Sequence, residues 1–228
     1  MSSDEPRYGL VNKEMVRGWL EMDRATDGPF YALNLMKYRK KAVYADGRES
    51  DISGSQADDA YNPMRILKDL GARIVFFGEV MEQTAGAPIY DRIAVVLYPT
   101  RMAFLEMQRR PDFVDSHEHK DAGMEFTIVA STSPITEPHE QTTGTLALVV
   151  EEAHSGAAFD PSSIDGATLI GTYSVEGQIV GDERQLQFAH WIQIENTEAF
   201  KAATEGNERL TALTVSRIID EMVLSQKA

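Results

Sequence analysis

The 228-residue sequence contains no cysteine. This absence excludes disulfide bonds, thiolate metal ligands and a cysteine nucleophile, and it is compatible with the cytoplasm, where we expect the protein to act. Basic residues are also scarce, since 22 Lys and Arg stand against 36 Asp and Glu and give a formal net charge of −14. Nucleic-acid binding requires a basic face, so this balance argues against a nucleic-acid partner.

Long apolar runs are missing as well. No stretch approaches the roughly 20 apolar residues that cross a bilayer. The N-terminal Met-Ser-Ser-Asp-Glu-Pro also lacks the basic start and apolar middle of a signal peptide. A Gly-rich phosphate loop, an HExxH helix, a nucleophile elbow and a dinucleotide fingerprint are absent too. We therefore expect no membrane partner, no metal site and no resident cofactor.

What the sequence does contain is a pattern that occurs twice. Residues 91–104, Asp-Arg-Ile-Ala-Val-Val-Leu-Tyr-Pro-Thr-Arg-Met-Ala-Phe, return in weaker form at 187–200 as Gln-Phe-Ala-His-Trp-Ile-Gln-Ile-Glu-Asn-Thr-Glu-Ala-Phe. The two copies are 96 residues apart at both ends. Each predicts a strand that runs directly into an amphipathic helix. The chain is therefore expected to contain a duplicated unit whose copies differ in their polar residues.

Apolar periodicity predicts the elements of both copies. After an N-terminal helix over 12–24, the first copy is expected to have strands at 30–38, 73–84, 90–98 and 125–131 and helices at 57–70 and 101–122. This is the ferredoxin-like order β-α-β-β-α-β. The second copy is expected to have strands at 145–151, 168–175, 185–195 and 216–224, a helix remnant within 155–167 and a helix over 197–213.

These elements predict two repeats joined by a polar segment. Residues 1–132 would hold the N-terminal helix and the first repeat, 133–143 a linker with two prolines, and 144–228 a degenerate second repeat. The strands are apolar on both faces, as in Ile-Val-Phe-Phe at 74–77, so each sheet needs a cover on both sides. We predict an α+β fold of tandem ferredoxin-like repeats whose antiparallel sheets pack face to face within one chain as a barrel-like sandwich.

Several short motifs make the first copy recognisable. They are Asn34-Leu-Met-Lys-Tyr38, Ser53-Gly54 before Ala60-Tyr61, Gly78-Glu-Val80, Tyr90-Asp-Arg-Ile93, Tyr98-Pro-Thr-Arg-Met-Ala-Phe104, Met107 and Pro111-Asp-Phe113. With them, residues 25–132 resemble a bacterial family of unknown function, number 1330 among such families, in the dimeric α/β-barrel superfamily. The chain departs from the family in having Lys120 where an arginine is usual, and the second copy has Gln187 where the first has Asp91.

This resemblance implies a fold and a mode of assembly, but no single activity. Members of the superfamily usually dimerise, so it implies a homodimer, although the second copy offers a substitute for the partner. Relatives include cofactor-free monooxygenases, isomerases, small-ring lactone enzymes and haem enzymes. A shared fold does not transfer a function between them.

Two polar residues in otherwise apolar strands, Asp91 and Asn34, are the first catalytic candidates. A buried carboxylate costs several kcal/mol unless it is paired. Asp91 would therefore be either a general base with a raised pKa or a structural acceptor for backbone amides, Arg92 or Arg101. Asn34 would stabilise negative charge that develops on a substrate oxygen.

The histidines His117 and His119 are further catalytic candidates. Residues two apart on a helix point in different directions, so the pair does not predict a metal site. One of the two would turn inward and act as an acid or base, unless both belong to a solvated helix face. The candidates for substrate binding are Tyr38, Tyr61, Tyr98, Lys120 and His190. The tyrosines and His190 have an alternative role in the core, and Lys120 could pair with Asp115 or Asp121.

Taken together, these residues suggest a small cofactor-free enzyme of isomerase, lyase or monooxygenase type. It would act by acid/base chemistry on a hydrophobic or carbonyl-bearing small molecule in a cleft of the barrel. The alternative is a non-catalytic protein that binds a small ligand in the same cleft.

Overall fold

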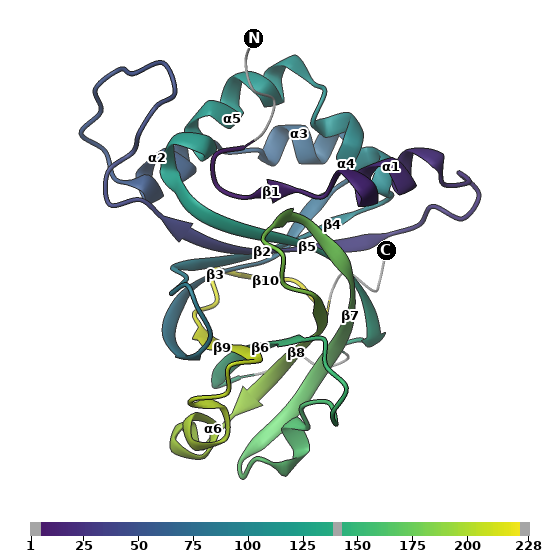
Figure 1. Cartoon of the computed structure of the whole chain (residues 1–228), viewed down its shortest axis with the longest axis vertical. Coiled ribbons are helices and arrows are strands. Elements are labelled where there is room, and N and C mark those ends of the chain that lie inside the picture. Colours follow the sequence, from purple (N-terminus) through teal and green to yellow (C-terminus); the bar gives the residue numbers. More distant parts are fainter. Residues whose placement is uncertain (1–5, 139–142, 224–228) are drawn as a thin grey trace.

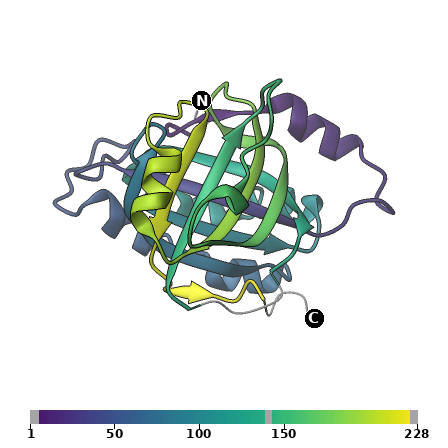
Figure 2. The same cartoon turned by 90° about the horizontal axis from the view of Figure 1, so that it is seen from below.

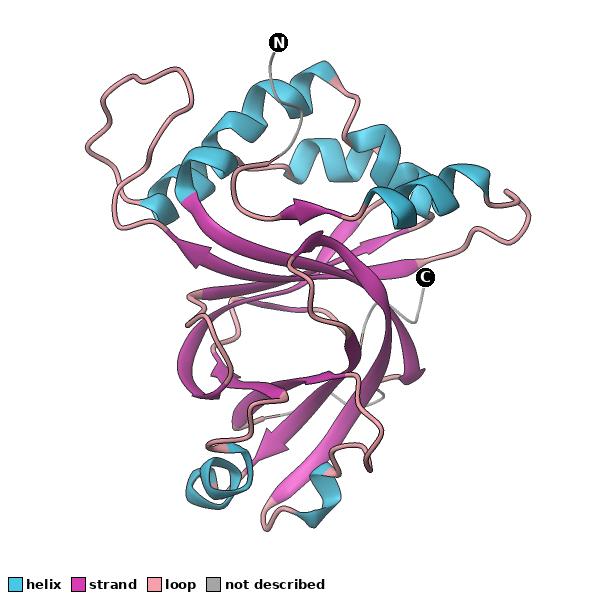
Figure 3. Ribbon diagram, in the orientation of Figure 1, coloured by secondary structure: helices cyan, strands magenta, loops and turns pink. Residues whose placement is uncertain are grey.

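The computed structural model describes residues 6–138 and 143–223, and its strands belong to one antiparallel sheet (Figures 1 and 3). The strands are β1 (Leu10–Val11), β2 (Phe30–Tyr38), β3 (Arg73–Ala85), β4 (Arg92–Tyr98), β5 (Met124–Thr136), β6 (Thr145–Glu152), β7 (Ala167–Gly181), β8 (Leu186–Ile194), β9 (Leu210–Val215) and β10 (Ile219–Asp220). The helices are α1 (Lys13–Glu21), α2 (Gly54–Ala60), α3 (Met64–Asp69), α4 (Arg101–Met107), α5 (Pro111–Gly123) and α6 (Thr197–Thr204), with a 3₁₀ turn at Pro161–Ser163.

Eight of these strands close into a barrel within the single chain. Their order is β7-β5-β2-β4-β3-β9-β6-β8, and β8 pairs again with β7. The two halves of the chain are joined by hydrogen-bonded strand pairs, β3 with β9 and β5 with β7, so the sheet is continuous around the ring (Figure 2). The expected closure within one chain is observed, but as one closed sheet instead of two sheets that only face each other.

The barrel encloses the largest apolar cluster of the protein. On β2, the alternate residues Tyr31, Leu33 and Leu35 point inward, where Phe76 packs on Trp191 with ring centroids 4.7 Å apart. Because successive strand residues face opposite sides, Ala32 and the other even-numbered residues of β2 point outward. The interior is thus filled by side chains, and the outer face of the sheet needs a separate cover.

Helices supply that cover on both halves. Helices α1 to α5 lie over the outer face of the first half, and α6 lies against the second half at the opposite end of the molecule (Figure 1). Under the first layer, Phe30 stacks on Tyr98 with centroids 5.4 Å apart, and Trp19 meets Phe104 edge-on at 6.0 Å. This layer positions the cavity described below.

Prolines and caps set the boundaries of these helices. The helix predicted over 57–70 is divided into α2 and α3 because Pro63 lacks the N–H that a continuous helix needs. Pro111 instead opens α5, where its missing N–H costs nothing. Ser53 and Gln56 form a capping box at the start of α2. The two predicted first-repeat helices are therefore four shorter ones.

The second half differs from its prediction in three places. The helix predicted over 197–213 ends at Thr204, and Leu210–Val215 forms β9. Its β-branched Thr and Val residues suit a buried strand, and β9 fills the gap between β3 and β6. Within the described residues 216–223, the strand predicted over 216–224 is reduced to Ile219–Asp220, and residue 224 lies outside the described part. The helix remnant is only the 3₁₀ turn. The linker is also shorter than predicted, since β5 continues to Thr136; residues 139–142 lie outside the described part.

Two glycines bring α2 and α5 into backbone contact. Neither Gly54 nor Gly123 has room for a Cβ, because each would overlap the carbonyl oxygen of the other, and at Gly54 the backbone of Arg39 as well. The amide of Arg39 also donates to the carbonyl of Gly123 at 2.8 Å. This close approach fixes the distance between the two helices that carry Asp58, Asp59, His117 and Lys120 of the cavity wall.

We therefore expect Gly123→Ala to lower the free energy of unfolding by about 1–3 kcal/mol, because the added methyl group forces the two backbones apart. Gly18→Ala is the matched control, since Gly18 lies in α1 with open space around its Cβ position. The control should raise stability by up to about 1 kcal/mol through helix propensity. Urea denaturation, monitored by tryptophan fluorescence, measures the free energy of unfolding of both variants. Equal effects of the two substitutions would contradict the proposed contact.

Candidate functional site

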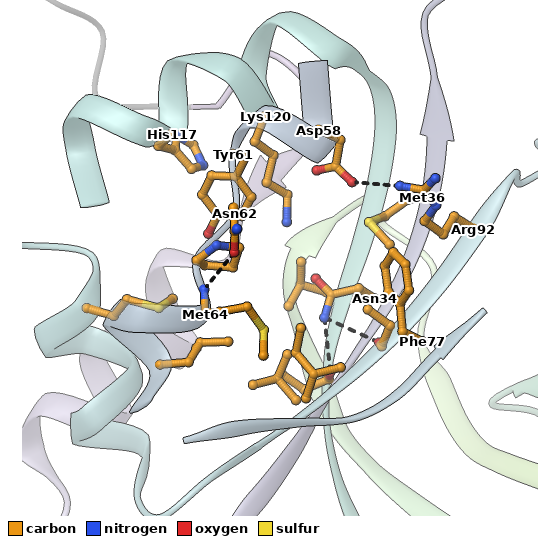
Figure 4. Close-up of a pocket in the computed structure, with 18 of the residues that line it drawn as sticks. Asn34, Met36, Asp58, Tyr61, Asn62, Met64, Phe77, Arg92, His117 and Lys120 are labelled. Carbon is orange, nitrogen blue, oxygen red and sulfur yellow. Dashed lines mark hydrogen bonds and ion pairs between the residues drawn. The ribbon is translucent and has the colours of Figure 1, made fainter. Parts of the chain in front are cut away.

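A cavity of about 360 Å³ lies between the helical layer and the outer face of the first-half sheet (Figure 4). Its position corrects the expectation of a cleft in the barrel, because the barrel interior is filled by the core. The lining is mainly apolar, and the volume is in the range of small-molecule sites. The polar residues in the wall are Tyr8, Asn34, Asp58, Asp59, Tyr61, Asn62, Arg92, Tyr98, Gln108, His117 and Lys120.

Helical spacing brings four of these side chains to the cavity. Asp58 and Tyr61 are three residues apart at the end of α2, and His117 and Lys120 are three residues apart on α5. Residues at this spacing share one face of a helix, so each helix presents two polar groups to the same space. The sheet contributes the opposite wall through Asn34 on β2.

Lys120 points into the cavity beside two aromatic rings (Figure 4). Its Nζ lies 6.0 Å from the ring centroid of Tyr8 and 5.5 Å from that of Tyr61. Within residues 6–138 and 143–223, the Nζ atom has no hydrogen bond and no carboxylate within ion-pair distance, so neither pairing foreseen for it, with Asp115 or with Asp121, is found. Burial lowers the pKa of Lys120, and the nearby charge of Asp58 opposes this shift. Among the described residues, the cavity therefore contains a cationic group without an acceptor.

Asp58 contributes a carboxylate to the same cavity. Its Oδ2 accepts a hydrogen bond from the Tyr38 hydroxyl at 2.6 Å and lies 3.6 Å from the Arg92 guanidinium. Burial, followed by the charge of Asp58, raises the pKa of Tyr38, so the phenol stays protonated and can only donate to this carboxylate. Arg92 also pairs with Asp59 at 2.9 Å and Glu79 at 3.1 Å, and these partners balance its charge.

His117 is held as a neutral imidazole. Its Nε2 lies 2.8 Å from the hydroxyl of Tyr8. Burial, followed by the positive charge of Lys120, lowers the pKa of His117 from 6.5 to about 4. At neutral pH the ring can therefore form a hydrogen bond with the Tyr8 hydroxyl, but it adds no charge to the cavity.

Asn34 offers an acceptor to the cavity instead of the donor expected from the sequence. Its Nδ2 donates to the carbonyl oxygens of Ala32 at 3.0 Å and Ala94 at 3.5 Å. Carbonyls can only accept, so these contacts assign the nitrogen and leave Oδ1 facing the cavity (Figure 4). The expected role in stabilising an oxyanion is wrong for this arrangement, because the amide donors are already used.

Five of the nine residues singled out in the sequence come together at the cavity: Asn34, Tyr61, Tyr98, His117 and Lys120. Tyr38 lies behind Asp58 and orients it. Tyr98 is buried and directs its hydroxyl to the sulfur of Met107 at 3.5 Å.

The other three lie elsewhere. The expected burial of Asp91 is wrong: the residue is exposed, and its carboxylate accepts from the Tyr38 amide at 2.7 Å, the structural role that was the alternative. His119 turns away from the cavity and bonds the Tyr44 hydroxyl at 2.8 Å. His190 lies in the second half, 3.1 Å from the hydroxyl of Thr172.

Six polar residues of the cavity wall were not foreseen as site residues: Tyr8, Asp58, Asp59, Asn62, Arg92 and Gln108. Asp58 had a usable signal, because it precedes Tyr61 by one helical turn. Tyr8 had none, since it reaches the cavity through the pairing of its backbone with Thr127 on β5. Arg92 was considered only as a partner for Asp91.

The chain is similar to several solved structures. No family model and no curated protein matches it. Solved structures that match include a protein of unknown function from Rhodopseudomonas palustris, which is 26% identical over 54% of this chain and 94% of that one, with a TM-score of 0.47. A putative monooxygenase from Lactobacillus acidophilus is 12% identical over 84% and 94% of the two chains, with a TM-score of 0.41.

A mutant chlorite dismutase from Candidatus Nitrospira defluvii is 9% identical over 86% of this chain and 95% of that one, with a TM-score of 0.46. These neighbours include folds of the dimeric α/β-barrel type. In the part of the chain that the structure describes, no group of three or more His, Asp or Glu side chains could hold a metal ion. None of the described helices is long and apolar enough to cross a membrane.

The lowered pKa of His117 makes stability depend on pH. On acidification the unfolded chain binds a proton near pH 6.5, whereas the folded state resists protonation until about pH 4. The free energy of unfolding should therefore fall as the pH drops, with His117 contributing a loss of about 2 kcal/mol by about pH 5. His117→Gln lacks this titration, so the stability difference between wild type and variant should change by that amount between about pH 7.5 and about pH 5. If the free energy of unfolding, measured by urea denaturation, changes with pH in the same way in the wild type and in His117→Gln, a neutral, buried His117 would be contradicted.

Proposed function

We propose that the protein is a small cofactor-free enzyme that acts by acid/base chemistry on a hydrophobic small molecule bearing a carbonyl group. One observation carries this proposal: the ammonium of Lys120 and the carboxylate of Asp58 face one apolar cavity and form no ion pair with each other. Opposite charges that are held apart in an apolar space leave room for a polar group of a ligand between them.

The two groups suit the removal of a proton next to a carbonyl. The carbonyl oxygen would lie at Lys120 Nζ, where the positive charge stabilises the enolate that forms. Asp58 would take the α-proton, and its hydrogen bond from Tyr38 would hold it in place. The Tyr61 hydroxyl has no hydrogen-bond partner among the described residues, and burial raises its pKa, so it is a second donor for the oxygen. Isomerisation, lyase chemistry and oxygenation can all start from such an enolate.

Asn34 would determine which ligands fit the opposite wall. Its Oδ1 needs a donor, so a hydroxyl or an N–H on the apolar body of the ligand would be favoured there. A ligand without such a group would leave this buried acceptor unsatisfied, which costs about 1–3 kcal/mol.

The second half would act as a built-in partner. We propose that the two halves are tandem ferredoxin-like repeats, because their strand orders, β5-β2-β4-β3 and β7-β8-β6-β9, are the same arrangement. The first repeat would belong to the bacterial family of unknown function that its motifs resemble. The second repeat would then replace the second subunit in closing the barrel, without excluding a homodimer formed through other surfaces. A small molecule in the cytoplasm would be the partner of the cavity, with no role for nucleic acid or membrane.

The proposed enolisation can be tested with β-tetralone, a compact ketone with an apolar body and acidic α-protons. We expect the wild-type protein to accelerate exchange of these protons in D₂O, as measured by NMR. Asp58→Asn should slow the catalysed exchange by about 10²–10⁴-fold because the base is lost. Lys120→Met should slow it by about 10²–10³-fold because the enolate loses its stabilising charge.

Lys41→Met is the matched control, because Lys41 is exposed and pairs only with the exposed Asp51. It should exchange protons at the wild-type rate. Binding of β-tetralone by the wild type without any accelerated exchange would instead support the alternative of a non-catalytic binding protein. Equal rates in the Lys120 and Lys41 variants would remove the proposed role of Lys120.

A further inference from the structure

We infer that Lys120 is a nucleophile that forms an imine with the carbonyl carbon of an aldehyde or ketone bound in the cavity. This inference rests on the proposed function and makes it more specific, because it turns an electrostatic contact into a covalent intermediate. It would also restrict the substrates to unhindered aldehydes and ketones, since esters and carboxylates do not form imines with an amine.

The surroundings of Lys120 differ from those of the other lysines. Three of these form ion pairs: Lys37 with Glu125 at 2.7 Å, Lys41 with Asp51 at 3.0 Å and Lys201 with Glu82 at 3.5 Å. An ammonium held by a carboxylate keeps its proton and is a poor nucleophile. In the described structure Lys120 Nζ forms no ion pair and lies near the rings of Tyr8 and Tyr61. Burial lowers its pKa, against the opposing charge of Asp58, so a larger share of it is the neutral amine that attacks carbonyls.

The position of Lys120 on α5 also directs its amine toward the part of the cavity where a carbonyl group would lie. Lys120 stands in the last turn of α5, which is held against α2 by the backbone contact of Gly54 and Gly123. Its side chain extends toward the apolar part of the cavity, where the body of a ketone would lie (Figure 4). A rigid helix and a restricted side chain reduce the entropy lost when the amine reaches the carbonyl carbon.

Asp58 can carry the protons that the reaction requires. Asp58 lies beyond ion-pair distance of Lys120 Nζ, so the ammonium gives one proton to Asp58 through a water molecule that enters the cavity with the substrate. The neutral amine then forms a C–N bond with the carbonyl carbon. The second proton moves from nitrogen to the carbonyl oxygen and gives a carbinolamine. Asp58 returns its proton as the C–O bond breaks and water leaves. In total, one ammonium and one carbonyl become one iminium and one water, with no change in charge and no oxidant or reductant.

The iminium leaves the electrostatics of the cavity unchanged. It carries the same single positive charge as the ammonium, and the ionised Asp58 remains its counter-charge. It also withdraws electrons from the neighbouring carbon more strongly than a hydrogen-bonded carbonyl does, so the α-proton becomes easier for Asp58 to remove. The covalent step and the acid/base step would thus use the same two residues.

Reductive trapping tests the inference in the intact protein. The wild type is incubated with β-tetralone and sodium cyanoborohydride, which reduces an imine to a stable amine, and the modified lysine is located by peptide mass spectrometry. We expect one adduct on Lys120, formed at least about tenfold faster than any adduct on the exposed Lys41 or Lys68. Adducts that follow exposure, with Lys120 unmodified, would overturn the inference.

Lys120→Arg separates the covalent role from the electrostatic one, since it keeps a positive charge without a nucleophilic amine. We expect it to lose both the adduct and the accelerated proton exchange, whereas Lys41→Arg keeps both; thermal unfolding confirms that each variant is folded. Exchange that persists in Lys120→Arg, or wild-type exchange without trapping, would overturn the imine and leave the proposed acid/base function standing. If the wild type neither binds β-tetralone, measured by calorimetry without reductant, nor accelerates its proton exchange, both the imine and the proposed acid/base function are overturned.

Discussion

The closure of the sheet is the constraint on which the rest of this structure depends. Once β8 pairs with β7, the inner faces of eight strands meet and are filled by large apolar side chains such as Phe76 and Trp191. The outer face then has to be covered by helices, because its strands are apolar there too. In the first half this cover leaves a space above Asn34, and that space is the cavity. The site therefore lies outside the barrel because the interior is filled by side chains and the helices that cover the outer face leave this space.

The two cationic side chains at the cavity, Arg92 and Lys120, differ in how their charges are paired. Arg92 sits among three carboxylates, and its charge is balanced by them. Lys120 has no such partner in the described part of the chain, and its neighbours are the rings of Tyr8 and Tyr61. Leaving a charge unpaired in a partly buried site lowers stability, and such a cost is typical of groups that act on a ligand. This distinction between the two cations is the reason why we propose Lys120 as the reactive group of the cavity.

Local sequence signals predicted most of the elements, and they were wrong where long-range pairing decided the outcome. The strand predicted at 30–38 matched the range of β2 because this stretch is mainly apolar and aromatic and starts directly after Gly28-Pro29. The last part of the predicted helix over 197–213 became β9, because the open edges of β3 and β6 supply hydrogen-bond partners that a local pattern cannot contain. For the site, Lys120 and Tyr61 were found from the sequence, whereas Asp58 and Tyr8 were not, because their roles depend on neighbours that lie far away in the chain.

The sequence by itself determined the class of the fold, the twofold occurrence of a strand–helix unit and the region that holds the polar candidates, because hydrophobic periodicity and turn residues act over short distances. Only the tertiary structure decided that the sheet closes in one chain and that the cavity lies outside the barrel. It also decided which polar groups meet. Asp91 lies at the surface, and the Asn34 side-chain oxygen faces the cavity. Asp58 and Lys120, which are 62 residues apart in the sequence, face the same cavity. Burial and charge pairing depend on contacts between distant segments, so no local pattern can assign them.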